Sequence, residues 1–356
     1  MHIARRRFLA TASTGLGGSC FLTACSDNAD RASGGAAGET DAESSAEPGG
    51  GGHGLLISLA QWSLHRALRS GELDNLDFPR VAKESCGIDA VEWVNQFFFV
   101  EHDTYGIQPK DDAYLSEMRK RLDDLGMMSP LVMCDRVGNL GHPDTAKRKA
   151  AVEGHYAWLD AAKGLGCHSL RVNAASDPSL SPERQADLCA DGLRSLSEKA
   201  ATLGLNVIVE NHGGLSSNGA WLAGVIRAVG LDNCGTLPDF GNFYVAKNRG
   251  DAEQYEKAKA PYVGDPTYTE DETGLGYDRY LGVEELMPFA KGVSAKSHDF
   301  DAEGNEIHTD FFRMMRIVRD AGYRGHVGVE YEGRELGEIE GILKTRELLE
   351  RSFAAL

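Results

Sequence analysis

The chain contains 356 residues, of which 42% are hydrophobic and 26% are charged, a composition typical of a globular protein rather than a disordered one. Its formal net charge of −17 gives an acidic surface that repels phosphate backbones, which disfavours nucleic-acid binding. Beyond the N-terminal region there is no uninterrupted run of about 20 apolar residues, so the sequence excludes a protein with several membrane-spanning helices.

The first 24 residues have the features of an export signal. Three consecutive arginines, Arg5 to Arg7, precede Phe8 and Leu9 in the order typical of a twin-arginine signal. The weakly apolar stretch that follows ends in Leu-Thr-Ala-Cys, which resembles a bacterial lipobox and predicts lipidation of Cys25. We therefore expect an extracytoplasmic lipoprotein that contacts the membrane only through its lipid. The alternative is a cytoplasmic protein whose N-terminal arginines occur by chance.

Residues 25–54 consist mainly of Gly, Ala, Ser, Asp and Glu, and include four consecutive glycines at 49–52. Such a segment cannot bury enough apolar surface to fold. We expect it to be a flexible linker between the lipid anchor and a single folded domain over residues 55–356.

The expected domain repeats one unit, in which a short apolar run ends in polar residues and is followed by an amphipathic helical pattern. The apolar runs predict eight strands, at residues 55–60, 88–94, 129–134, 169–173, 206–210, 235–239, 292–296 and 326–330. The patterns between them predict helices at residues 115–125, 145–165, 182–203, 221–229, 283–290, 311–321 and 339–353. Several of these helices precede a glycine suited to a helix C-terminus, such as Gly126 and Gly322.

Eight strands that alternate with helices over about 300 residues predict a (β/α)8 TIM barrel. The alternative is an open doubly wound sheet, but no GxGxxG motif follows the first predicted strand and the sequence contains no Walker loop. Residues 244–282 exceed a normal connection and are rich in Tyr, Asp, Glu and Lys. We interpret this segment as a candidate lid or specificity loop at the catalytic mouth.

The cysteines of the expected domain are widely spaced and include no CxxC pair. Buried free thiols fit this spacing better than a disulfide framework or a zinc ribbon. The residues concerned are Cys86, Cys134, Cys167, Cys189 and Cys234.

Active sites of such barrels lie at the C-terminal ends of the strands. Glu210, Asp239 and Glu330 each end an apolar run there, where a charge is expensive to bury without compensation. Three carboxylates at one barrel mouth would repel each other, and a divalent cation is the usual remedy. With one imidazole added, the set favours Mn²⁺ and tolerates Zn²⁺, Co²⁺ or Mg²⁺. The alternative is that each acid caps a helix or pairs with a surface lysine.

Four strand ends in chain order read Glu-Asn-His-Gly-Gly, Pro-Asp-Phe-Gly-Asn, Ala-Lys-Ser-His-Asp-Phe-Asp and Gly-Val-Glu-Tyr-Glu-Gly. Over about residues 55–350 this order resembles the xylose-isomerase-like barrel superfamily, which includes the sugar phosphate isomerases and epimerases. The resemblance implies one metal ion held by a Glu, an Asp, a His and a Glu from strands five to eight. In this chain those residues are Glu210, Asp239, a histidine near strand seven, and Glu330.

The seventh strand departs from the family pattern, which tends to show His-x-His before the loop. Here Ser294, Lys296 and His298 share one face at period two, and His298 is the only imidazole among them. His298 is therefore the predicted ligand. The rival interpretation places Ser294 or Lys296 at the ligand position with His298 behind it. His212 then supplies the nitrogen, unless it is a loop histidine bonded to the backbone.

The resemblance implies a sugar isomerase or epimerase that works through an enediolate, with Glu210 and Glu330 as the acid/base pair. Lys296 is the predicted stabiliser of the developing oxyanion. The predicted substrate-binding residues are polar side chains that bind hydroxyl groups and aromatic side chains that stack on the sugar: Glu92, Arg171, Asn173, His212 and Asn242, and Trp62, Trp93 and Phe97.

The loops that follow strands seven and eight are strongly acidic, which favours a non-phosphorylated carbohydrate substrate. The same proton abstraction on a 3-keto-glycoside would allow β-elimination, so a lyase is the alternative enzyme. A carbohydrate-binding lipoprotein without activity is a third interpretation. An endonuclease with a trinuclear zinc site is disfavoured by the acidic charge. The sequence leaves the identity of the sugar and the oligomeric state open.

Overall fold

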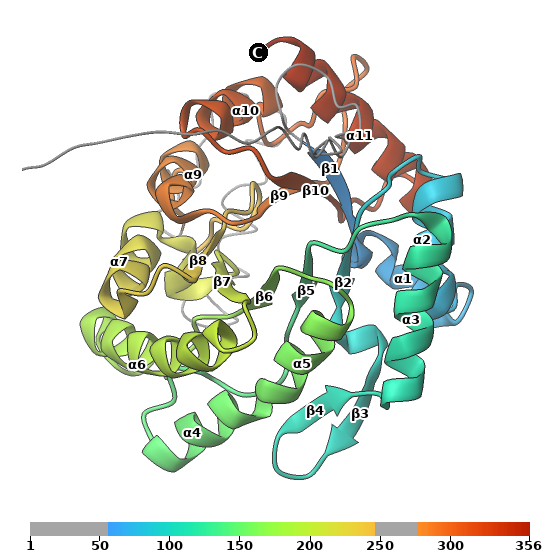
Figure 1. Cartoon of the computed structure of the whole chain (residues 1–356). Coiled ribbons are helices and arrows are strands. Elements are labelled where there is room, and N and C mark those ends of the chain that lie inside the picture. Colours follow the sequence, from blue (N-terminus) through green and yellow to red (C-terminus); the bar gives the residue numbers. More distant parts are fainter. Residues whose placement is uncertain (1–55, 246–275) are drawn as a thin grey trace, which may run out of the picture. The chain divides into compact units, whose positions relative to one another are not determined.

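The eight apolar runs form eight parallel strands of one sheet in the computed structural model, which describes residues 56–245 and 276–356 (Figure 1). The order along the sheet is β8-β7-β6-β5-β2-β1-β10-β9, and bridges of Thr236 with Ala290 and of Asp239 with Ser294 join its two edge strands. The predicted (β/α)8 barrel is thereby confirmed. In chain order the strands are β1 (Leu56–Ala60), β2 (Val91–Val94), β5 (Leu131–Met133), β6 (Ser169–Val172), β7 (Asn206–Glu210), β8 (Cys234–Leu237), β9 (Val293–Ser297) and β10 (His326–Tyr331).

Helices surround the strands on the outside of the barrel (Figure 1). Several begin at a side-chain cap: Asp111, Asp144 and Ser181 each accept a backbone N–H of the first turn. The helix that follows Asp111 ends at Gly126, whose φ of 62° is a left-handed conformation that glycine adopts without strain. The helices are α1 (His65–Ser70), α2 (Phe78–Glu84), α3 (Asp112–Leu125), α4 (Thr145–Gly154), α5 (Tyr156–Gly164), α6 (Pro182–Ala201), α7 (Gly219–Val229), α9 (Arg279–Leu286), α10 (Phe311–Asp320) and α11 (Glu338–Ala354).

Three features differ from the sequence prediction. The helix predicted at 145–165 is two helices, which meet at His155, where the imidazole Nδ1 lies 2.7 Å from the carbonyl oxygen of Ala151. The short helices α1 and α2 fill the connection between β1 and β2. A hairpin of β3 (Phe99–His102) and β4 (Gly106–Pro109) follows β2. Ile107 of this hairpin is buried, and its carbonyl oxygen accepts a hydrogen bond from the indole N–H of Trp158 on α5.

Alternation along the strands separates the barrel interior from the layer beneath the helices. On β2, Val91 and Trp93 belong to the large outer core, whereas Val94 belongs to a small inner cluster. The same alternation on β9 and β10 turns the outer-core valines and alanine toward the helices and leaves polar residues inside the barrel. These inward residues are Ser294 and Lys296 on β9 and Glu330 on β10.

Several predictions fall partly or wholly outside the described residues. The signal peptide at 1–24, the lipidation site Cys25 and the linker at 25–54 lie outside them, as does most of the candidate lid at 244–282. The prediction of buried free thiols is confirmed for the five cysteines of the barrel. Within residues 56–245 and 276–356, no helix combines the length and apolar character needed to span a membrane.

Candidate functional site

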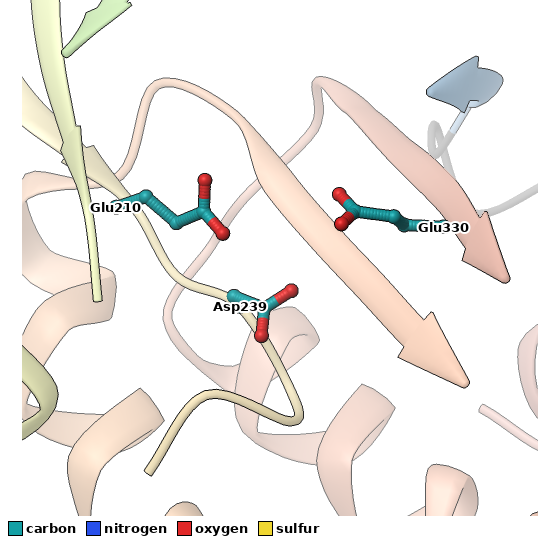
Figure 2. Close-up of side chains that lie close together, drawn as sticks. All are labelled: Glu210, Asp239 and Glu330. Atoms are coloured by element: carbon teal, nitrogen blue, oxygen red, sulfur yellow. The ribbon is translucent and has the colours of Figure 1, made fainter. Parts of the chain in front are cut away.

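Three acidic side chains from neighbouring strands converge at the C-terminal end of the barrel (Figure 2). Glu210 is the last residue of β7, Asp239 follows β8 by two residues, and Glu330 lies in β10. Each offers one carboxylate oxygen, and these three oxygens lie within 4.8 Å of one another. Asn211 fixes the turn at Asp239, since its side chain both accepts the Asp239 N–H at 2.8 Å and donates to the Asp239 carbonyl at 2.9 Å.

The carboxylates of this cluster are buried and repel one another. The side chains of Glu210, Asp239 and Glu330 are 1%, 0% and 4% exposed. Burial, with a further contribution from the neighbouring Glu210 and Glu330, raises the pKa of Asp239 to about 8, and burial also raises the pKa of Glu330. Oxygen ligands in such mutual contact fit a hard divalent cation, which would relieve this repulsion. The described residues therefore contain an acidic triad that could hold a metal ion.

Strand β9 adds a hydroxyl and an ammonium group to this cluster. The Ser294 hydroxyl donates to Oδ2 of Asp239 at 2.6 Å and lies 3.3 Å from Oε2 of Glu330. Lys296 donates through Nζ to Oε1 of Glu330 at 2.8 Å and to Oε2 of Glu332 at 2.7 Å. Although burial opposes its charge, the surrounding carboxylates raise the pKa of Lys296 well above the ordinary value. Lys296 is therefore a buried cation at neutral pH.

The structure does not bring His298, the predicted fourth ligand, to the acidic cluster. Period-two alternation holds only in extended backbone, and β9 ends at Ser297, one residue earlier. The backbone N–H of His298 donates to Glu306 at 3.3 Å, and its ring packs edge-on against His308 at 6.0 Å between centroids. The rival interpretation fits better, because Ser294 is the β9 side chain in contact with Asp239. His212 also lies outside the triad and lines the adjoining cavity.

On the opposite side of the cluster, Arg171 of β6 connects two acids. Its Nε and one terminal nitrogen bond Oε2 of Glu210, and its other terminal nitrogen donates to Oδ1 of Asp135 at 2.7 Å. Asn242 donates to the remaining oxygen of Glu210 at 3.0 Å. Burial alone would raise the pKa of Asp135, but the guanidinium lowers it to about 2. Glu210 is therefore held by two donors and Asp135 stays ionised.

A cavity of about 400 Å³ adjoins the triad, and Glu330 is the triad member that lines it. Its wall includes six residues that the sequence analysis assigned to catalysis or substrate binding: Trp62, Arg171, His212, Asn242, Lys296 and Glu330. The other lining residues are Val94, Gln96, Met133, Asp135, Gly213, Tyr244 and Glu332. A cavity of this volume with convergent polar groups is typical of a small-molecule site.

Trp62 forms an aromatic wall of this cavity and is fixed by three contacts. Its indole N–H donates to Glu332, its ring stacks on His65 at 4.9 Å with 16° between the planes, and the Arg69 guanidinium lies 4.7 Å from the ring centroid. Phe97 lies beside it at 6.2 Å between ring centroids. Aromatic faces at a polar cavity suit the apolar faces of a sugar ring.

Two substrate-binding predictions place residues wrongly, and a third predicted residue, Asn173, lies at a neighbouring cavity. Trp93 is fully buried in the outer core and packs edge-on against Phe78 and Phe98, because its position on β2 faces the helices. Glu92 points into the barrel below the cavity, where Ser58 donates to it at 2.6 Å and its other oxygen has no partner among the described residues. Asn173 donates to Asp135 at 2.7 Å and lines a smaller cavity beside the one at the triad.

Two acids at the cavity were not predicted as site residues. Asp135 directly follows the predicted strand at 129–134, so the strand-end rule that selected the triad would have found it. Glu332 lies two residues after Glu330, one residue beyond the end of β10, and lines the same cavity. Its contacts with Lys296 and Trp62 depend on residues about 36 and 270 positions away in sequence, which no local pattern indicates.

Comparison with known proteins identifies a family and several similar folds. The family model described as xylose isomerase-like TIM barrel matches residues 79–352. A D-tagatose 3-epimerase-like protein is 16% identical and has a TM-score of 0.58, with 84% of this chain and 97% of that chain covered. A zinc-bound IOLI protein is 13% identical with a TM-score of 0.57, and the match covers 84% of this chain and 98% of that chain. The 3-keto-D-glucoside 4-epimerase from E. coli is 14% identical with a TM-score of 0.54, and the match covers 84% of this chain and 100% of that chain.

Among curated proteins, the C-glycoside deglycosidase alpha subunit of Arthrobacter globiformis is 36% identical over 75 residues. The match covers 19% of this chain and spans only 21% of that relative's length. This short match adds a carbohydrate-active protein to the comparison, and the structural neighbours establish similarity of fold.

Proposed function

Because the chain belongs to the xylose isomerase-like TIM barrel family, we propose that it is an isomerase or epimerase that transfers a proton beside the carbonyl group of a non-phosphorylated carbohydrate. The observation that carries this proposal is the buried triad of Glu210, Asp239 and Glu330 beside a polar cavity. Glu210 and Glu330 reach the triad from different strands, so they can serve opposite faces of a reacting carbon.

The triad is proposed to hold one divalent cation. The candidate ligand atoms of the triad are all oxygens, with the Ser294 hydroxyl beside them, which favours hard cations such as Mn²⁺ or Mg²⁺ over Zn²⁺. When bound, the cation would polarise a sugar carbonyl and acidify the neighbouring C–H bond.

The protein side chains then divide the proton transfer between them. One of Glu210 and Glu330 removes the proton to leave an enediolate, and the other returns a proton to the opposite face or to the adjacent carbon. Lys296, which lies 2.8 Å from Glu330, is placed to stabilise the negative charge that develops on the oxygen. Arg171 and Asn242 fix the orientation of Glu210.

The charges of the cavity support a substrate without a phosphate group. Both cations in the described part of its wall already bond carboxylates: Arg171 bonds Glu210 and Asp135, and Lys296 bonds Glu330 and Glu332. A phosphate would have to displace one of these acids and would face the others at close range. A neutral sugar needs only hydrogen bonds, which these same side chains can provide.

Elimination from a 3-keto-glycoside is the second candidate reaction, and the short match to a C-glycoside deglycosidase subunit supports it. One glutamate would remove the proton from carbon 2, beside the carbonyl at carbon 3. The electron pair would then form the C1–C2 double bond as the bond to the aglycone breaks. The aglycone would leave with that bonding pair and take up a proton.

An exchange experiment tests the proposal and separates the two reactions. Free ketoses, aldoses and 3-keto-glucosides are incubated with the protein in D₂O, with and without Mn²⁺. Deuterium in an epimer or isomer supports the first reaction, and release of aglycone supports the second. The absence of both deuterium incorporation and aglycone release with all of these sugars would overturn the proposed function.

We also propose that the protein acts outside the cytoplasm as a lipoprotein exported by the twin-arginine route. The supporting features are the arginines at 5–7 and Cys25, all of which lie outside the described residues. An extracytoplasmic location is consistent with a non-phosphorylated substrate, because sugar phosphates are scarce there.

A further inference from the structure

A second cavity, of about 220 Å³, adjoins the one at the triad. The two cavities share His212 and Gly213, which lie two and three residues after Glu210, the catalytic candidate that ends β7. Gly213 has a φ of 84° and contributes no side chain to the border between the two spaces. Tyr244 lines the first cavity and Val245 lines the second, which gives the cavities a second common border.

The second cavity presents an uncharged wall. No described residue that lines it is an acid, a lysine or an arginine. Its apolar surface comes from two loops and the start of α6, with Ala174, Pro178, Leu180, Pro182 and Leu215 as the main contributors.

Three polar side chains of this wall are engaged with the protein itself. Gln185 donates to the Leu180 carbonyl at 2.9 Å, Ser216 donates to the Gly213 carbonyl at 2.9 Å, and Ser176 donates to the Gly141 carbonyl. These three donors are occupied, whereas Oδ1 of Asn173 is buried without a hydrogen-bond partner among the described residues. With one such acceptor among mostly apolar residues, the wall favours an apolar group over a ring that carries many hydroxyls.

From these two adjoining cavities we infer that the substrate is a glycoside with an aromatic aglycone. This inference rests on the proposed function. The sugar occupies the charged cavity at the triad, and the aglycone crosses at His212 and Gly213 into the uncharged cavity. The anomeric carbon of a glycoside is substituted, so the sugar ring cannot open to release a carbonyl group there. The carbonyl beside the transferred proton therefore belongs to the closed sugar ring.

The size of the second cavity specifies the aglycone further. An apolar cavity of about 150 Å³ in another protein accommodates benzene, so 220 Å³ suits one substituted ring. The rings of Pro178 and Pro182 offer flat apolar faces for such a group. A free monosaccharide would leave this surface without a partner.

Equilibrium binding tests the inference without requiring turnover. The probes are 4-nitrophenyl and methyl glycosides of glucose, galactose and xylose, which lack the carbonyl group that the reaction needs. Calorimetry compares each pair on the full chain. We expect at least one sugar for which the aryl glycoside binds tenfold or more tightly than the methyl glycoside.

Two variants assign this preference to the cavity. Leu180→Asp places a charge in the wall, and Leu215→Trp fills the space without a charge. Each should reduce the aryl preference to less than twofold while the affinity for the methyl glycoside changes by less than threefold. Leu343→Asp, at an exposed leucine of α11, should keep the full preference. Melting temperatures verify that the variants fold.

Equal affinity for aryl and methyl glycosides, or an aryl preference that survives in both variants, would overturn the aglycone site. Failure of both glycosides of every sugar to bind would overturn it as well. The proposed function is tested separately by the exchange experiment in D₂O, and it fails if neither deuterium incorporation nor aglycone release is found. A protein that epimerises free sugars without any aryl preference would retain the proposed function and lose the aglycone site.

Discussion

The Ser294 hydroxyl lies 2.6 Å from Oδ2 of Asp239, whereas the predicted ligand near β9 was His298. The hydroxyl also approaches Glu330, so it bridges two members of the triad that belong to β10 and to the end of β8. The candidate ligand atoms of the triad and of Ser294 are therefore all oxygens. His298 lies one residue beyond the end of β9.

Metal binding is expected to depend on Asp239 and not on His298. Asp239→Asn removes a charged ligand from the centre of the triad and should weaken Mn²⁺ binding by about 100-fold or more. His298→Ala should change the affinity by less than threefold. Metal analysis of the purified proteins and calorimetric titration with Mn²⁺ measure both effects. Loss of metal from the His298 variant with retention in the Asp239 variant would contradict this assignment.

Turnover is expected to require both glutamates of the triad. Glu210→Gln and Glu330→Gln keep the shape of the side chain but remove its capacity to accept a proton, so each should lower kcat by more than about 100-fold. Metal content is measured in parallel, because both residues are candidate ligands. Glu117→Gln, on the surface of α3, serves as the control. A glutamine variant that binds metal and works at nearly the normal rate would refute the acid/base roles.

The triad could be predicted from sequence because a parallel barrel places all its strand ends at one rim. Glu210, Asp239 and Glu330, the acids that end apolar runs, could thus be predicted to lie near one another. The fourth position could not be predicted in this way. It depends on the point at which β9 ends, and the residue where a strand ends is set by tertiary contacts such as the one between His298 and Glu306.

The errors at β2 have a different cause. Glu92 and Trp93 are adjacent in a strand, so they face opposite sides, and they were nevertheless both assigned to the substrate. Neither faces the cavity: Trp93 packs beneath the helices, and Glu92 lies inside the barrel against Gly328, where a Cβ atom would approach the carboxylate to 2.7 Å. This burial deeper in the barrel depends on a glycine more than 200 residues away, and the local sequence carries no sign of it.

Lys296 is expected to support both folding and turnover. Lys296→Met would leave the buried Glu330 and the partly exposed Glu332 without their cation, and breaking a buried pair such as Lys296 with Glu330 costs about 3–5 kcal/mol. Urea unfolding should show a loss of stability in this range. Turnover should fall by about 100-fold, because the group that stabilises the developing oxyanion is lost.

The control for this experiment is Lys149→Met, which removes an exposed lysine that pairs with Glu153 on α4. We expect this variant to change stability by less than about 0.5 kcal/mol. Normal turnover in a folded Lys296→Met protein would rule out the oxyanion role, even if the stability loss is found.

The proposed export route predicts the cellular location of two variants. Cys25→Ser removes the acceptor for lipid and should move the protein from the membrane fraction to the soluble extracytoplasmic fraction. Replacement of Arg5 and Arg6 by lysine should retain the protein inside the cell. Fractionation followed by immunoblotting measures both. A native protein that stays in the cytoplasm without lipid would contradict the assignment.

Glu92→Gln is expected to stabilise the barrel increasingly as the pH rises. Burial raises the pKa of Glu92 from an ordinary 4.5 to about 8. Between these values the unfolded chain has released a proton that the folded chain keeps, so native stability falls with rising pH, by at most about 1.4 kcal/mol per pH unit. Glutamine cannot ionise, and its oxygen can still accept the Ser58 hydroxyl.

Urea unfolding should therefore give similar stabilities for the native protein and the Glu92→Gln variant at pH 4.5, and a more stable variant at pH 7.5. Glu84→Gln, at an exposed glutamate, serves as the control. A stability difference that is constant with pH, or that favours the native protein at pH 7.5, would show that Glu92 is ionised in the folded state.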